Sequence, residues 1–79
     1  MELKRQIGIR FKSVRVQKKL SQDQVAKVSG FDRSYISHVE NGKLNISIET
    51  LERLVESIGM SIYDFFIMDC KYRNLKRGS

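Results

Sequence analysis

The sequence predicts a small all-α domain of five helices in one chain of 79 residues. Three observations point to that class. Apolar residues recur three and four positions apart, which is the spacing of a buried helix face. Serine or aspartate stands before these apolar runs and glycine stands after them, as at helix caps. No stretch alternates apolar and polar residues like a half-buried strand, and the chain contains no proline.

The first two helices are expected over the amino-terminal third of the chain. One should cover about residues 3–18, with a buried face made of Ile7, Phe11 and Val14. Ser21 and Gln24 then have the spacing of a capping box, so a second helix should begin after Ser21. Its short apolar stripe consists of Val25 and Val28. Gly30 is expected to end this helix.

Three further helices follow with short connections. Asp32 is placed to cap the third helix and Ser47 the fourth. The apolar stripe of the fourth helix consists of Ile48, Leu51, Leu54, Val55 and Ile58. Ser61 and Asp64 resemble another capping pair, which predicts a fifth helix. The basic tail, residues 69–79, either forms a last helix or is frayed.

The charge balance favours a polyanionic partner. Fifteen Lys and Arg against nine Asp and Glu give a formal net charge of +6. Nucleic acid and an anionic membrane surface both fit such a balance. No apolar run approaches the roughly 18 residues that a membrane helix needs, and the first residues lack a signal-peptide pattern. We therefore expect a cytoplasmic protein without membrane association, a location that also suits the single cysteine.

The side-chain inventory argues against an enzyme, a metal site or a cofactor site. One cysteine and one histidine cannot form a disulfide or supply a tetrahedral zinc site. No nucleophile has a base at a meaningful spacing, and there is no glycine-rich phosphate loop. The aromatic residues recur at core spacing rather than opposite a basic face, which disfavours a membrane-surface helix. We expect no small-molecule substrate.

The segment from Phe31 to Lys43 has an unusual polar face. Projected at about 100° per residue, its polar residues fall within an arc of roughly 140°. They are Arg33, Ser34, Ser37, His38 and Asn41. Tyr35, Ile36 and Val39 occupy the opposite side. Side chains that donate and accept hydrogen bonds, with arginine on guanine the commonest, read base edges in the major groove of DNA.

The helix before this segment makes the pattern more specific. Two helices joined by a tight, glycine-containing turn form a helix-turn-helix unit, here over about residues 22–41. Ala26 is the small residue expected where the helices touch, and Gly30 lies in the turn. The apolar residues expected between the helices and the core are Val25, Phe31, Ile36 and Val39. Their mutually consistent spacing indicates a DNA-binding unit.

The run from Leu20 to Met60 resembles the helix-turn-helix regulators that include phage repressors and Cro, the xenobiotic-response-element family. Within that family, the run from Phe31 to Ser47 looks most like the controller proteins of restriction-modification systems. The likeness covers about residues 7–66. It implies a five-helix, repressor-like, sequence-specific transcriptional regulator that binds a pseudo-palindromic double-stranded DNA operator as a homodimer. A prophage-type repressor and the antitoxin half of a toxin-antitoxin complex are the alternatives.

The resemblance implies roles for individual positions. Its base-reading positions match Arg33, Ser34 and His38, and Ser37 lies on the same face. Gln22 matches a residue that clamps a phosphate at the start of a helix, where free N–H groups favour an anion. The loop that contacts the DNA backbone matches Asn41, Lys43 and Asn45, and the Tyr35 hydroxyl is placed to reach a phosphate. Arg15 and Glu40 match a salt bridge between the first and third helices.

The sequence departs from the family pattern at two places. The residue before Leu20 is often glycine in the family and is Lys19 here. If that residue is left-handed, lysine there costs on the order of 1 kcal/mol relative to glycine. The common Asn-Pro-Ser after the loop is Asn45-Ile46-Ser47 here, which leans toward the controller proteins.

The carboxyl-terminal part is expected to form a dimer interface. The apolar residues of about 58–70 exceed what one short helix can bury internally. We expect Phe65 to enter the core of its own chain. That leaves Ile62, Phe66 and Ile67 as the residues of a twofold contact. Burial of all of these residues within one chain is the alternative.

Overall fold

The computed structural model describes residues 2–67. Its helices are joined by turns and loops. Its labelled helices are α1 (Leu3–Gln17), α2 (Gln22–Ser29), α3 (Arg33–Glu40) and α4 (Ile48–Ser57), and residues 62–67 are also helical. The described range contains no strand, so the expected all-α fold is confirmed. The expectations for the tail at 69–79 and for the end of the dimer region lie outside the described residues.

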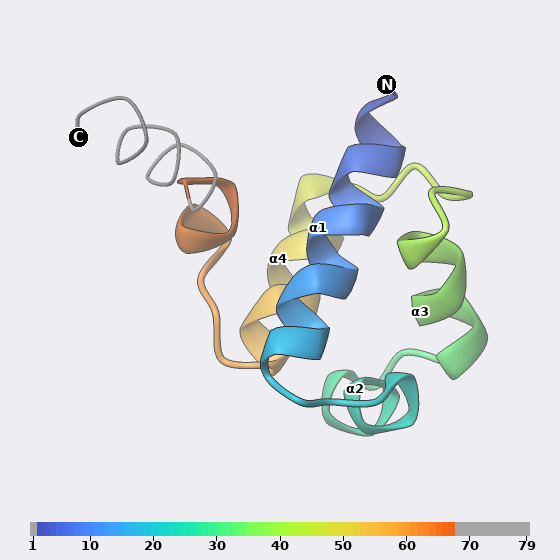
Figure 1. Ribbon diagram of the computed structural model, residues 1–79, viewed down its shortest axis with the longest axis vertical. Helices are drawn as coiled ribbons and strands as arrows, with labels where there is room; N and C mark the ends of the chain where they lie inside the picture. The colour runs from blue at the N-terminus through green and yellow to red at the C-terminus, as the bar shows by residue number, and fades with distance from the viewer. Residues whose placement is uncertain (1, 68–79) are drawn as a thin grey trace.

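The helices enclose one core rather than forming a regular bundle. α1 runs across the front of the molecule, α2 lies beneath it, and α3 stands at the side (Figure 1). α3 packs against both α1 and α2, and α2 also contacts α4. The short helical segment 62–67 lies at the opposite side from α3 (Figure 1). α3 is therefore held by two helices while one of its faces remains at the surface.

Every helical segment contributes to the core. The buried apolar side chains are Phe11, Val14, Val25, Ile36, Val39, Leu51, Leu54, Val55, Ile58 and Phe65. Each such side chain contributes about 1.5–3 kcal/mol when it leaves water. Phe65 belongs to the core, as expected, and joins the segment 62–67 to the helices before it. Ala26 and Phe31 pack against this cluster but are only partly buried.

The predicted caps are mostly present. The Ser21 hydroxyl accepts from the Gln24 N–H at 3.0 Å, and the Gln24 side chain accepts from the Ser21 N–H at 2.7 Å. Ser47 accepts from the backbone N–H of Thr50 in the same way, at 3.1 Å. Ser61 accepts from Asp64 N–H at 3.0 Å. These bonds satisfy N–H groups that the first turn of a helix leaves without a backbone partner.

Expectations about four individual residues were wrong. Val28 and Ile48, expected on buried stripes, are 58% and 59% exposed. Val28 is in the last turn of a two-turn helix, and Ile48 is the first residue of α4, so both lie beyond the edge of the core. Asp32 occupies the N-cap position of α3, but its side chain accepts no capping hydrogen bond. Phe31 is half-buried rather than buried.

The approach of α3 to α1 depends on Gly8, in the middle of α1. A Cβ atom added at Gly8 would lie 2.3 Å from the carbonyl oxygen of Val39 and 2.9 Å from that of Glu40. Glycine costs roughly 0.5–1 kcal/mol relative to alanine inside a helix, so its presence needs a packing reason. The reason here is space, because the carboxyl end of α3 rests against the backbone of α1. This contact sets the position of α3 against α1.

Candidate nucleic-acid interface

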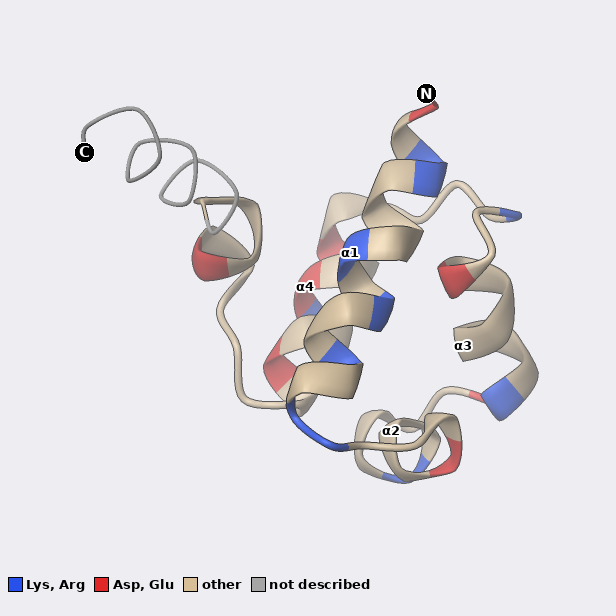
Figure 2. Ribbon diagram, in the orientation of Figure 1, with Lys and Arg blue, Asp and Glu red and all other residues tan. Residues whose placement is uncertain are grey.

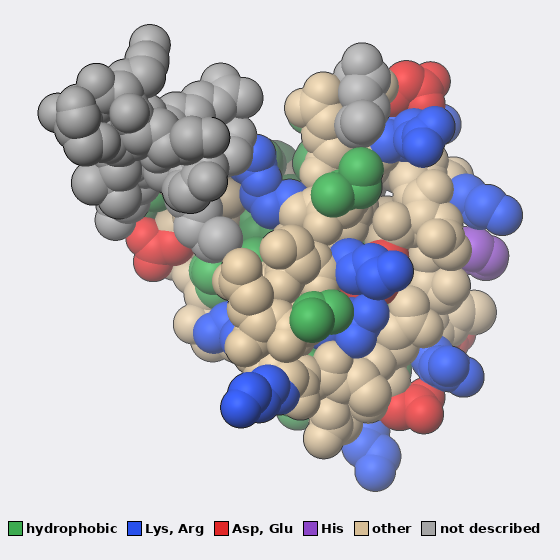
Figure 3. All heavy atoms as spheres, in the orientation of Figure 1, with side chains coloured by type: hydrophobic (Ala, Val, Ile, Leu, Met, Phe, Trp, Pro, Cys, Tyr) green, Lys and Arg blue, Asp and Glu red, His purple; other side chains and the backbone are tan. Residues whose placement is uncertain are grey.

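The polar face of α3 is at the surface, as the helical projection predicts. Arg33, Ser34 and His38 are exposed, while Ile36 and Val39 are buried on the opposite side. Figure 3 shows the single histidine at the edge of the molecule formed by α3, between groups of Lys and Arg side chains. α3 therefore offers donors and acceptors along one side and is anchored by aliphatic side chains along the other.

Arg33, in the first turn of α3, forms an ion pair with Asp23 of α2. The Arg33 Nε lies 3.3 Å from Asp23 Oδ1, and the two side chains are 65% and 70% exposed. Exposed pairs of this kind contribute about 0–1 kcal/mol. The nearest atoms of the pair are Arg33 Nε and Asp23 Oδ1. The Arg33 side chain is thus lightly held across the turn between the two helices.

The second half of the face contains a side-chain hydrogen bond. Asn41 Nδ2 donates to Ser37 Oγ at 3.4 Å, a long bond on the exposed surface. Ser37 itself is half-buried, in contrast to Ser34. Because a hydroxyl both donates and accepts, Ser37 keeps its own O–H proton for another partner. The loop after α3 continues this surface, with Lys43 and Asn45 exposed.

One flank of α3 is an aromatic stack. The rings of Phe31 and Tyr35 are stacked with centroids 5.0 Å apart and planes inclined by 15°. The guanidinium carbon of Arg53 in α4 lies 5.6 Å from the centroid of the Phe31 ring. This arrangement connects α4 to the beginning of α3. It fixes the plane of the half-buried Tyr35 ring.

The other flank is a buried ion pair. Arg15 donates from Nε to Glu40 Oε2 at 2.6 Å and from Nη2 to Glu40 Oε1 at 3.0 Å. The pair expected from the resemblance is therefore present, between α1 and the last residue of α3. Gln22 Nε2 also donates to Glu40 Oε1, at 3.1 Å. Arg15 Nη1 donates to the carbonyl of Leu20 at 2.8 Å. The Glu40 carboxylate therefore joins α1, α2 and α3, and Arg15 also holds the turn after α1.

Charge is distributed unevenly over the helices. Lys and Arg recur along α1, whereas the acidic residues of α4 gather on its surface (Figure 2). α4 carries Glu49, Glu52 and Glu56, all exposed. α3 has no acidic residue on its polar face, because its only acidic residue, Glu40, is buried. A polyanion is therefore more compatible with the surface of α3 than with that of α4.

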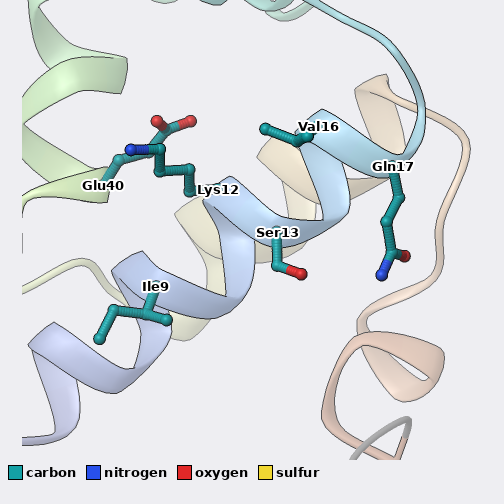
Figure 4. A pocket seen from close by; sticks show the side chains of 6 residues that line it. All are labelled: Ile9, Lys12, Ser13, Val16, Gln17 and Glu40. Carbon is teal, nitrogen blue, oxygen red and sulfur yellow. The ribbon is translucent and has the colours of Figure 1, made fainter.

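A shallow hollow on α1 lies outside this face. Figure 4 shows its lining side chains, five of them from α1 and one, Glu40, from α3. They are Ile9, Lys12, Ser13, Val16, Gln17 and Glu40. Both carboxylate oxygens of Glu40 are already bonded to Arg15. Among the described residues, no cluster of His, Cys, Asp and Glu could hold a metal ion.

The expected dimer residues lie beside Phe65. Ile62 and Phe66 are half-buried and pack against the core of their own chain, and Ile67 is also half-buried. The Phe65 and Phe66 rings meet edge to face at 5.4 Å. Each of the three residues keeps part of its surface in water.

Within residues 2–67, no helix has the length and apolar character needed to cross a membrane.

The sequence reasoning missed two residues that contact α3. Asp23 pairs with Arg33, and Gly8 lets α3 approach α1. Gly8 has a readable signal, since a glycine inside a helical pattern costs about 1 kcal/mol relative to alanine and so calls for a packing explanation. Asp23 has no such signal in the sequence, because a surface ion pair between two helices depends on how the helices cross.

Comparisons with known proteins agree with this geometry. A family model described as helix-turn-helix matches residues 11–65. Control protein C.MunI from Mycoplasma sp is 35% identical over 82% of this chain and 89% of its own length. The immunity repressor protein of Bacillus phage phi105 is 34% identical over 71% of this chain but only 39% of its own length. A solved structure of the restriction-modification controller protein C.Esp1396I, a tetramer with its natural 35 base-pair operator, matches with a TM-score of 0.82 and 31% identity over 90% of this chain and 93% of that chain.

Proposed function

The chain belongs to the helix-turn-helix family, and we propose that it is a sequence-specific, DNA-binding transcriptional regulator. One observation carries the proposal. α3 turns Arg33, Ser34 and His38 to solvent while Ile36 and Val39 fix its opposite side in the core. The side chains on the free face are those that recognise base edges in the major groove. The net charge of +6 supports a polyanionic partner.

Within this function, the residues divide into base readers and backbone contacts. Arg33 is the main base reader, with its terminal nitrogens directed at a guanine. The other base readers are Ser34, Ser37 and His38. Contacts to phosphates come from Gln22, Tyr35, Asn41, Lys43 and Asn45. These two groups have different consequences, because base contacts determine sequence preference and phosphate contacts determine register and salt dependence.

The operator-binding form is a homodimer. Ile62, Phe66 and Ile67 supply the twofold contact through the apolar surface that remains exposed beside Phe65. A twofold dimer of this unit places its two recognition helices about 34–36 Å apart. Its operator is then a pseudo-palindrome with half-sites one helical turn apart.

We assign the regulator to the controller proteins of restriction-modification systems, acting in the cytoplasm. The matches to C.MunI and C.Esp1396I over most of both chains support this assignment. The match to the phage phi105 immunity repressor supports a prophage repressor as the second candidate. The neighbouring genes distinguish the two. A methyltransferase or endonuclease gene supports the controller, and phage genes support the repressor.

Selection of bound DNA from a random pool tests the function directly. The expected product is a set of sites that share a pseudo-palindrome, with guanine at a fixed position of each half-site. Fluorescence anisotropy with one selected site should then give a dissociation constant at least about 10³-fold below that of a scrambled site at the same salt concentration. Failure to enrich any sequence would contradict the proposal.

A further inference from the structure

We propose that Glu40 is a positioning residue that holds the Gln22 side chain ready for a DNA phosphate. In this view the buried ion pair does more than join α1 to α3. It also fixes the side chain of the first residue of α2 in the position from which that side chain binds a phosphate. The inference rests on the proposed DNA-binding function, and within that function it concerns how one backbone contact is prepared before DNA arrives.

The carboxylate of Glu40 is occupied on both oxygens. Oε2 accepts from Arg15 Nε at 2.6 Å, and Oε1 accepts from Arg15 Nη2 at 3.0 Å. Oε1 also accepts from Gln22 Nε2 at 3.1 Å. The Glu40 side chain is only 2% exposed, so its position is set by these donors rather than by water. An ion pair between α1 and α3 needs only Arg15, and the bond to Gln22 is an additional link to α2.

Gln22 is suited to a phosphate once it is held in this way. Its amide nitrogen carries two N–H donors, and one bond to Glu40 leaves the second for another acceptor. Gln22 is the first residue of α2, where unpaired backbone N–H groups and the helix dipole favour an anion. A free glutamine loses rotamer freedom when it binds. A glutamine already fixed by a buried carboxylate loses less, so the phosphate contact is stronger.

The Glu40 carboxylate also fixes the position of Gln22 relative to the loop that contains Lys43. Arg15 holds the carbonyl of Leu20, directly before the cap residue Ser21. Glu40 is the last residue of α3, and the loop that contains Lys43 follows it. Gln22 on one side of α3 and the loop on the other are therefore tied to a single buried group. Their separation is set before DNA is bound.

Side-chain amide relaxation in the DNA-free protein tests the positioning without any substitution. Gln17, an exposed glutamine at the end of α1, is the internal control. The Gln22 amide should have an order parameter of about 0.8 and the Gln17 amide one below about 0.6. A Gln22 amide as mobile as that of Gln17 would overturn the inference.

A double-mutant cycle tests whether the positioning affects DNA. Dissociation constants for the selected operator are measured for the unaltered protein, Gln22→Ala, Glu40→Gln and the double variant. Gln22→Ala should weaken binding about tenfold, as expected for a lost hydrogen bond to a charged group. Glu40→Gln should weaken it several-fold alone and leave it unchanged when Gln22 is already alanine. Urea unfolding establishes that each variant is folded, and if Glu40→Gln does not fold, the relaxation measurement decides.

Three outcomes overturn the inference and leave DNA binding intact. One is an equal effect of Glu40→Gln in both backgrounds, which would mean that Glu40 acts only through the fold. Another is a folded Glu40→Gln variant that binds the operator like the unaltered protein. The third is a Gln22→Ala variant with unaltered affinity, which would mean that Gln22 makes no contact with a phosphate. Loss of sequence selectivity in the unaltered protein would instead contradict the proposed function.

Discussion

The two ends of α3 are held in opposite ways. At its carboxyl end, the Glu40 side chain is 2% exposed and bonded to Arg15 at 2.6 Å, and Val39 rests against Gly8. At its amino end, Arg33 and Asp23 form a longer pair, at 3.3 Å, with both side chains more than half exposed. A buried pair with ideal geometry resists separation, whereas an exposed pair is readily exchanged. The difference indicates that one end of α3 stabilises the fold and the other is available to a partner.

Breaking the buried pair should have the largest effect. Arg15→Ala leaves Glu40 as an unpaired buried charge, which costs about 3–5 kcal/mol of unfolding free energy. Urea denaturation measures the loss. Lys27→Ala, which removes an exposed cation from α2, is the control and should change stability by no more than about 0.5 kcal/mol. Similar values for the two variants would remove the distinction between the ends of α3.

Crowding the carboxyl end should cost somewhat less. Gly8→Ala places a methyl group 2.3 Å from the Val39 carbonyl oxygen, so the helices must separate. Overpacking of this kind costs about 1–3 kcal/mol. Thermal or urea unfolding measures it, with Ser13→Ala on the exposed side of α1 as the control. Unchanged stability of Gly8→Ala would show that the contact is loose.

A change in the α1–α2 turn should stabilise the protein without altering either end of α3. Lys19 has a φ of 61°, in the left-handed region that favours glycine. Lys19→Gly should therefore gain up to about 1 kcal/mol. The matched control is Lys18→Gly, which removes the same charge at a residue with φ −84° and should not stabilise. An equal effect of both substitutions would attribute the change to charge rather than to backbone conformation.

The smallest effect is expected at the loop after α3. Lys43→Gln should leave unfolding unchanged within about 0.5 kcal/mol. The substitution should lower the affinity for the selected site and for scrambled DNA by the same factor. It should also reduce the slope of log K against log salt by about 0.9, the value for one phosphate. Anisotropy titrations at several salt concentrations measure both. A change in sequence preference would show that Lys43 contacts a base.

Much of the fold was predictable because its determinants are local. The capping box of Ser21 and Gln24, the cap at Ser47 and the helical spacing of the core residues lie within a few positions of one another. Val28 and Ile48 were misjudged because periodicity identifies a face but not how far the core extends along it. Asp32 was misjudged because residue type indicates a cap position, not whether its hydrogen bond forms.

The interface was predictable only in part, for the same reason. Which residues of α3 share its exposed face follows from helical geometry alone. The pairing of Arg33 with Asp23 and the bond from Gln22 to Glu40 depend on how α2 and α3 cross. Gly8 meets Val39 only because α1 and α3 approach closely. Contacts of that kind join residues 10 to 31 positions apart and have no short-range pattern.

The most direct test of the central claim compares Arg33→Ala with the unaltered protein on two DNA molecules, the selected operator and a scrambled sequence, at one salt concentration. If the open end of α3 reads bases, the variant should lose about 1–3 kcal/mol of binding free energy on the operator. It should lose much less on scrambled DNA, relax the preference at one base of each half-site, and unfold at nearly the same urea concentration. Equal losses on both DNA molecules would contradict the account, because Arg33 would then contact only phosphate.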